Sequence, residues 1–432
     1  MDGLFPLINQ LHSACQDLPE AVQRQARRLL LDTWGCMLAG RRDPIVAQFE
    51  HTWSAHDRGN VTFPEGPGLS VGASALVAAT AACWDEACEG HAGAHGRPGV
   101  AVFAAIYPFI EQRSLGDVLR AYTLGYEVCA RAGALLRIRE GMHVDGNWPA
   151  LGAAASVACL LNLPPAQIAQ AVNAAACQLP MSLYWPVRQG ANIRNTYLGH
   201  AAQTGQLAAL AVASGLNAPD NATQAYARVA LGDAPIQWPA FQQFEIASAY
   251  IKPFAAVRHV HYGATCAQVL HDQVDPQRVE SIQLRVYEEA MTYCGNRAPA
   301  GPLQAQFSLS FGIAAMLRHG RLDPAVYREP LFSDPLLHRL ESLVSIDIDQ
   351  AMSLRAERGC HLAITLDDGR VLQHAFSSVV GDAACPMPDD MLATKFESYA
   401  IPTLGQTAAR EHSHVWLEAD LQQPMSSIFF NS

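Results

Sequence analysis

Apolar positions near the start of the chain follow a helical period. From Pro19 to Leu38 they recur every three or four residues, and Gly40 is a suitable helix end. Similar runs, rich in alanine and separated by glycine or proline, predict further helices at Ser70–Cys83, Val100–Glu111, Leu115–Ala134, Leu151–Leu161, Pro165–Ala176 and Gly199–Ser214. Because small faces let helices approach closely, we expect roughly the first 250 residues to form one helical domain.

The pattern changes near Asp275. Residues that favour β-structure alternate or cluster at Ser281–Tyr287, Val344–Ile348 and His361–Leu366. Asp368-Gly369, followed by Val371–Phe376, is a hairpin signal. These segments predict a smaller α+β domain.

A linker and a further helix are expected near the C-terminal end. The stretch Gly381–Asp390 contains Pro386 and Pro388 and is typical of a linker. Met391–Ala400 is helical in pattern again. If this segment returns to the helical domain, the α+β domain is an insertion within it.

Composition and charge narrow the classes of partner. The net charge is -11, with 29 Lys and Arg against 40 Asp and Glu, and no long basic run, which disfavours nucleic acid. No apolar stretch of about 18 residues predicts a membrane span, and the N-terminus does not resemble a signal peptide. We therefore expect a cytoplasmic protein. The 11 cysteines lie mostly in apolar helical segments without CxxC spacing, so buried, reduced thiols are expected.

The segment Trp84–Gly99 is the first candidate for chemistry. It places three acids, His91, His95 and Arg97 among glycines between two apolar helices. Such a composition suits a functional loop whose backbone passes close to a ligand. A solvated loop is the plain alternative. A metal site is disfavoured, since a spacing of four between the histidines means little outside a helix.

Three further polar segments follow. They are Gly141–Pro149 with His143, Arg188–Asn195 with Arg194, and Tyr250–Tyr262 with Lys252, Arg258, His259 and His261. The second precedes a helix and could bind a carboxylate at its N-terminus, unless it is a surface turn. A lone His143 could equally be structural, and the His-x-His pair would face one side of a strand but lacks a nearby acid or cysteine for a metal.

Together the four segments supply histidines, acids and cations suited to general acid–base catalysis on a carboxylate. The chain carries no nucleophile elbow, phosphate loop or dinucleotide fingerprint. We therefore expect an enzyme that needs neither a metal nor an organic cofactor.

The order of several short segments resembles the MmgE/PrpD family, which includes 2-methylcitrate dehydratase, cis-aconitate decarboxylase and iminodisuccinate epimerase. The segments are Leu31–Gly40, Gly125–Val128, Gly152–Ala155, Gln306–Leu309 and Pro386–Phe396 with Lys395-Phe396. The resemblance implies a mainly α protein, usually a homodimer. Its helical domain would comprise residues 1–262 and 392–432, with an inserted α+β lid at residues 263–391.

The resemblance also implies site residues. Asp85 matches the Asp that opens the family's Asp-Phe-Asp-Asp motif, and His95, His143 and His261 match catalytic histidines. The remaining candidates are substrate-binding: Glu89, His91, Arg194, Lys252, Arg258 and His259. The chain departs from the family at Glu86–Glu89, at Arg194 where the family has Lys, and at Phe311 where it has an aromatic hydroxyl. These departures are expected to change the substrate rather than the fold.

The expected activity is that of a lyase acting on a small carboxylate. A carbanion or enolate beside the carboxylate would form, stabilised by Arg194, Lys252 and Arg258, with His95 and His143 exchanging protons. Asp85 would abstract a proton or orient a histidine, and His261 would join the site when the lid closes. An isomerase or epimerase with the same proton transfers is a close alternative, and a non-catalytic ligand-binding protein is a more distant one.

Overall fold

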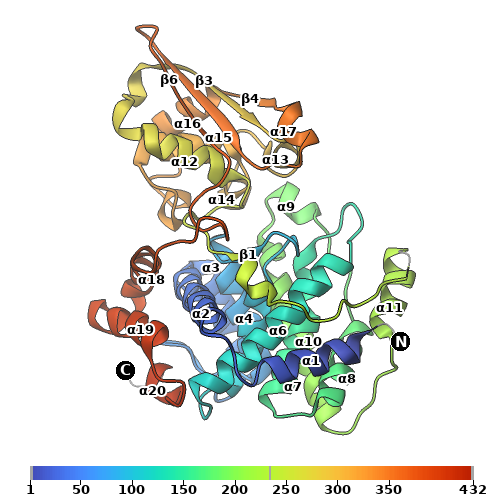
Figure 1. The fold of residues 1–432 in the computed structure, drawn as a ribbon. Helices are drawn as coiled ribbons and strands as arrows, with labels where there is room; N and C mark the ends of the chain where they lie inside the picture. The colour runs from blue at the N-terminus through green and yellow to red at the C-terminus, as the bar shows by residue number, and fades with distance from the viewer. Residues whose placement is uncertain (1–2, 233–234, 430–432) are drawn as a thin grey trace.

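The computed structural model describes residues 3–232 and 235–429. Most of the N-terminal part is helical (Figure 1), and α7 (Pro149–Leu160) is one of its helices. The other helices of this part are α1 (Leu4–Ala14), α2 (Glu20–Arg41), α3 (Pro44–His56), α4 (Val71–Trp84), α5 (Pro98–Ile106), α6 (Leu115–Leu135), α8 (Pro165–Ala176), α9 (Trp185–Gln189), α10 (Tyr197–Ala213) and α11 (Ala222–Tyr226). Helix α7 contacts α5, α6, α8 and α10.

The helices predicted from the apolar pattern are confirmed. Helix α4 begins after Ser70, whose hydroxyl caps the helix, and every residue from Ala73 to Cys83 is buried. The predicted helix at Val100–Glu111 ends earlier, at Ile106, and a 3-10 turn at Tyr107–Phe109 follows. Pro108 explains the early end, because it has no backbone N–H to continue the α-helical bonding.

Small residues allow the central helices to pack at short range, as expected. A Cβ atom on Gly125 of α6 would lie 2.7 Å from the Gly152 carbonyl oxygen of α7. Only glycine permits this crossing. All 11 cysteines are free, and most are buried, in agreement with the prediction.

The α+β region contains a four-stranded sheet. Its strands are β3 (Val279–Val286), β4 (Val344–Ile348), β5 (Cys360–Leu366) and β6 (Val371–Phe376), in the order β4-β3-β5-β6. Only the β3–β4 pair is parallel. The predicted strands and the hairpin are confirmed, and Gly369 in the turn has a φ of 81°.

The α+β region also contains helices. They are α12 (Val260–Leu270), α13 (Glu288–Cys294), α14 (Pro302–Gln306), α15 (Leu309–His319), α16 (Pro335–Ser342) and α17 (Gln350–Leu354). Helix α12 packs against β5, β6 and α15. Because α12 begins at Val260, His259 and His261 do not lie on a strand, and the expectation of a shared strand face is wrong.

The last helices return to the N-terminal part (Figure 1). Helices α18 (Asp389–Leu404) and α19 (Gln406–Glu418) pack against α2, and α20 (Ser426–Phe429) follows. The Lys395 ammonium donates to the buried Asp32 carboxylate at 2.5 Å and to the Ala87 carbonyl at 2.8 Å. The chain's two ends are therefore joined beside the loop that follows α4. In residues 3–232 and 235–429, no helix has the length and hydrophobicity needed to cross a membrane.

Candidate active site

A cavity of about 430 Å³ lies where the helical part meets the α+β region. All four polar segments of the sequence contribute to its lining. Seven of the ten candidate residues line it: His91, His95, His143, Arg194, Lys252, Arg258 and His259. Asp85, Glu89 and His261 do not.

The loop between α4 and α5 forms one wall of the cavity. Within the loop, His91 and Gly96 form an isolated antiparallel β-bridge. Strand β1 (Gly90–His91) pairs with β2 (Ala249–Tyr250). A Cβ on Gly90 would overlap the Tyr250 ring, so the pairing requires glycine there. Glu86 and His95 have φ of 52° and 56°, values that side-chain-bearing residues seldom adopt. Such strain is typical of functional loops.

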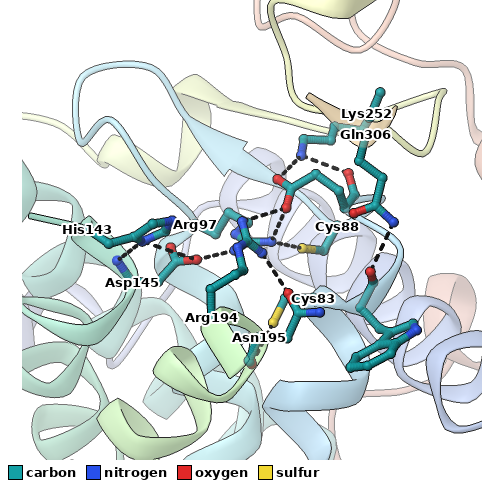
Figure 2. Close-up of polar contacts among 12 residues, drawn as sticks. Cys83, Cys88, Arg97, His143, Asp145, Arg194, Asn195, Lys252 and Gln306 are labelled. Atoms are coloured by element: carbon teal, nitrogen blue, oxygen red, sulfur yellow. Dashed lines mark hydrogen bonds and ion pairs between the residues drawn. The ribbon is translucent and has the colours of Figure 1, made fainter. Parts of the chain in front are cut away.

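Glu86 is the centre of a buried charge cluster, whose cations Arg97, Arg194 and Lys252 are labelled in Figure 2. Its carboxylate accepts from Arg97 at 3.1 Å, from Arg194 at 2.9 Å and from Lys252 at 2.9 Å. The Lys252 ammonium also donates to the Glu86 carbonyl at 2.9 Å. Burial alone would raise the pKa of Glu86, but the three cations outweigh it and hold that pKa far below its usual value. Glu86 is therefore ionised and binds three segments together.

His143 lies beside this cluster, connected through Asp145 (Figure 2). The Arg97 guanidinium pairs with the Asp145 carboxylate, and the Asp145 backbone N–H donates to His143 Nδ1 at 3.1 Å. Because Nδ1 accepts, the neutral ring carries its proton on Nε2. Burial lowers the pKa of His143 to about 4, so the ring is neutral near pH 7.

Arg258 is held at the edge of the α+β region. Its guanidinium pairs with Asp382 and approaches His261 Nδ1 at 3.2 Å. It also lies over the Tyr250 ring, 5.1 Å from the centroid. His261 uses its other nitrogen, Nε2, on the Ala256 carbonyl at 2.9 Å. Both ring nitrogens of His261 are thus occupied, and the residue is placed to orient Arg258 rather than to reach the cavity.

His91 and His95 occupy different environments. His91 Nδ1 accepts from the Ala94 backbone N–H at 3.1 Å, and Nε2 lies 3.2 Å from the Glu245 carbonyl, so both nitrogens serve the loop. The exposed His95 side chain at the rim makes no hydrogen bond with the described residues. Partial burial, and then the charge of Arg137, lower the pKa of His95, which favours its neutral form.

Asp85 and Glu89 face away from the cavity. Asp85 pairs with Arg328 of the α+β region at 3.1 Å, and burial raises its pKa to about 6. Glu89 accepts from the Gly99 backbone N–H, at the start of α5, at 2.7 Å. Burial raises the pKa of Glu89 to about 8, so this carboxyl is protonated near pH 7.

Several residues that line the cavity were not among the candidates predicted from the sequence. Glu86, Arg97, Asp145, Glu289 and Arg358 all line the cavity. Glu86 and Arg97 lie within the polar segment that the sequence indicated, but nothing in a sequence shows which of two adjacent acids faces inward. Phe311, where the resemblance implied a lost hydroxyl, is buried and stacks on Tyr327 at 5.8 Å, outside the cavity lining.

The cavity lining is positively charged overall. Six cations line it, namely Arg97, Arg137, Arg194, Lys252, Arg258 and Arg358, against the three acids Glu86, Asp145 and Glu289. Asp382, outside the lining, balances Arg258, and the excess of positive charge that remains in this partly buried site favours an anionic ligand. In the described ranges, no group of three or more His, Cys, Asp and Glu side chains is arranged to hold a metal ion.

Comparison with known families agrees with this architecture. The MmgE/PrpD N-terminal domain matches residues 11–236, and the MmgE/PrpD C-terminal domain matches residues 254–419. No significant match to the curated proteins is found. The two matches cover most of the helical part and the whole of the α+β region. The chain therefore belongs to the MmgE/PrpD family, which includes dehydratases and decarboxylases and whose members are generally enzymes.

Proposed function

We propose that this protein is a lyase that binds a small carboxylate in the cavity and dehydrates or decarboxylates it through an enolate. The observation that carries the proposal is the convergence of Arg97, Arg194 and Lys252 on one carboxylate, Glu86, within a cavity that also contains neutral histidines. Family membership is consistent with this chemistry.

Substrate binding would rest on the cations that Glu86 only partly neutralises. Arg194 Nε is buried and has no hydrogen-bond partner among the described residues. The planar guanidinium can bind a carboxylate with two parallel hydrogen bonds, which a lysine cannot. Arg194 and Lys252 would hold the carboxylate and stabilise the charge that develops beside it.

His143 would act as a hydrogen-bond donor rather than as a base. Its Nδ1 is already occupied by a backbone N–H, and Nε2 carries the proton. A neutral imidazole N–H aimed at a substrate oxygen stabilises an enolate without introducing a full charge.

His95 is the best candidate base. Its side chain is unbonded and its lowered pKa leaves it able to accept a proton near pH 7. In a dehydration, His95 would take the proton from the carbon beside the carboxylate. The enolate would then expel the β-hydroxyl, which takes the proton from the His95 imidazolium and leaves as water. In a decarboxylation, the C–C bond breaks with release of CO2, and the carbanion carbon takes a proton from a solvent water molecule.

Asp85 and His261 take positioning roles in this proposal. Asp85 would hold Arg328 and the α+β region against the loop, and His261 would orient Arg258. Neither would contact the substrate, which departs from the roles that the family resemblance implied.

The test is a panel of di- and tricarboxylates incubated with the protein in deuterated water and followed by proton NMR. The expected result is an unsaturated or decarboxylated product, with turnover reduced about 10²–10⁴-fold in His95→Ala. The exposed His51→Ala is the matched control and should retain full activity and the same Tm.

Other outcomes have definite meanings. Deuterium exchange at carbon without loss of a group would identify an isomerase or epimerase instead. Wild-type activity in His95→Ala would remove this residue from the mechanism. Absence of any carboxylate binding would overturn the proposed function.

A further inference from the structure

The cavity lining contains two chemically different groups of side chains. The charge cluster around Glu86 is one of them. The segment after α6 contributes Arg137 and four apolar side chains, namely Leu136, Ile138, Met142 and Val144. These four apolar side chains cannot hydrogen-bond strongly to a carboxylate, so they are available to an apolar part of a ligand.

Rings form a continuous stack along another part of the lining. His143 stacks on Tyr184 at 5.7 Å, Tyr184 meets Tyr293 edge to face at 5.9 Å, and Tyr293 stacks on His259 at 5.8 Å. The stack crosses from the helical part to the α+β region. Burial lowers the pKa of both histidines to about 4, so both imidazole rings are uncharged near pH 7.

This stack is not an extension of the main hydrophobic core. Tyr184 packs against a separate small cluster formed by Val187, Leu303 and Phe307. Tyr293 remains 45% exposed although it contacts two other rings. Apolar surface left open beside a charged site is characteristic of ligand contact.

The cavity is large enough for an apolar group in addition to a carboxylate. An apolar cavity of about 150 Å³ accommodates a benzene ring. The present cavity, at about 430 Å³, exceeds that size severalfold. A small polar polycarboxylate would leave these apolar side chains in contact with water. They would then add no hydrophobic contribution to its binding free energy.

We infer that the substrate carries an apolar substituent, an aryl ring or an alkyl chain of several carbons, which lies between the ring stack and Ile138 while its carboxylate meets Arg194 and Lys252. This inference rests on the proposed function and narrows its substrate class. Tyr293 and Ile138, which come from different segments of the lining, then determine specificity.

Calorimetric titration of the purified full chain with three probes tests the inference. The probes are succinate, 2-phenylsuccinate and propane-1,2,3-tricarboxylate. Burial of the phenyl ring should make phenylsuccinate bind about tenfold or more tightly than succinate. The tricarboxylate, which adds charge but no apolar surface, should not show this gain.

Variants of lining residues test whether the preference for phenylsuccinate over succinate arises in the cavity. Tyr293→Ala and Ile138→Gln should each remove most of the preference for phenylsuccinate. Trp185→Ala is the matched control, because Trp185 is an exposed aromatic residue beside Tyr184 that does not line the cavity. It should keep the preference.

The outcomes separate this inference from the proposed function. If succinate and the tricarboxylate bind but phenylsuccinate binds no tighter, the apolar-substituent inference is overturned and the proposed function stands. If none of the three binds, both fail. A preference that survives in Tyr293→Ala and Ile138→Gln alike would also overturn the inference.

Discussion

Replacement of Glu86 by glutamine should change stability and anion binding in opposite directions. The wild-type carboxylate balances Arg97, Arg194 and Lys252, all within 3.1 Å of it and all buried. Glutamine keeps the shape but removes the negative charge. Three buried cations then face one another, and Asp145 remains as the counter-charge of Arg97.

The loss of stability can be estimated from this geometry. Removing one partner of a buried ion pair typically costs about 3–5 kcal/mol. An unfolding entropy of about 2.1 cal/mol/K per residue, over 432 residues, amounts to about 0.9 kcal/mol/K. For a chain that melts in one transition, Tm should therefore fall by about 3–6 °C.

The affinity for anions should rise in Glu86→Gln, because the carboxylate that competes with the ligand for the three cations has been removed. At an effective dielectric constant of about 20, a charge about 6 Å away contributes about 3 kcal/mol. Solvent in the open cavity screens part of this, and we expect succinate to bind about tenfold more tightly to Glu86→Gln.

Scanning calorimetry and titration calorimetry at pH 7 and low salt measure the two effects. Glu140→Gln, at an exposed glutamate that directly precedes the Gly141–Pro149 segment, is the matched control and should change neither. The stabilisation from Glu86 is complete above the ordinary glutamate pKa and is lost as pH falls toward its lowered folded-state pKa. An unchanged Tm together with unchanged succinate affinity would refute the charge-cluster reasoning.

Three other predictions follow from buried groups. Glu89→Gln should match wild-type stability near pH 5 and exceed it at pH 9, because the raised pKa of about 8 makes wild-type stability fall as pH rises from the unfolded pKa to that value. Asp382→Asn should raise KM about three- to tenfold with a smaller change in kcat, because Asp382, outside the cavity lining, no longer fixes the position of the Arg258 guanidinium. Lys395→Met should cost about 3–5 kcal/mol, because Asp32 is left charged and buried.

Each has its own control and refuting result. Equal melting curves for Glu89→Gln and wild type at pH 9 would show that Glu89 already ionises easily. An unaltered KM in Asp382→Asn would show that Arg258 does not need its ion pair with Asp382 in order to bind the substrate. Adding Asp32→Asn to Lys395→Met should recover most of the lost Tm, and no recovery would mean that lost packing, not charge, explains the effect.

Local signals were enough to predict much of the fold. The apolar period and the cap at Ser70 define α4, and alternation with Asp368-Gly369 defines the β5–β6 hairpin. The sequence did not predict that α12 begins at Val260, because the His259-x-His261 spacing suggested a strand. That choice depends on packing against β5, β6 and α15, which no local pattern contains.

The site divides in the same way. The sequence by itself located the four polar segments and seven of the residues that line the cavity, because dense histidine, glycine and charge between apolar helices are local properties. It could not choose between Asp85 and Glu86. Only the tertiary structure decided that choice, because the positive φ at Glu86 and three cations from distant segments turn Glu86 inward while Arg328 holds Asp85 outside.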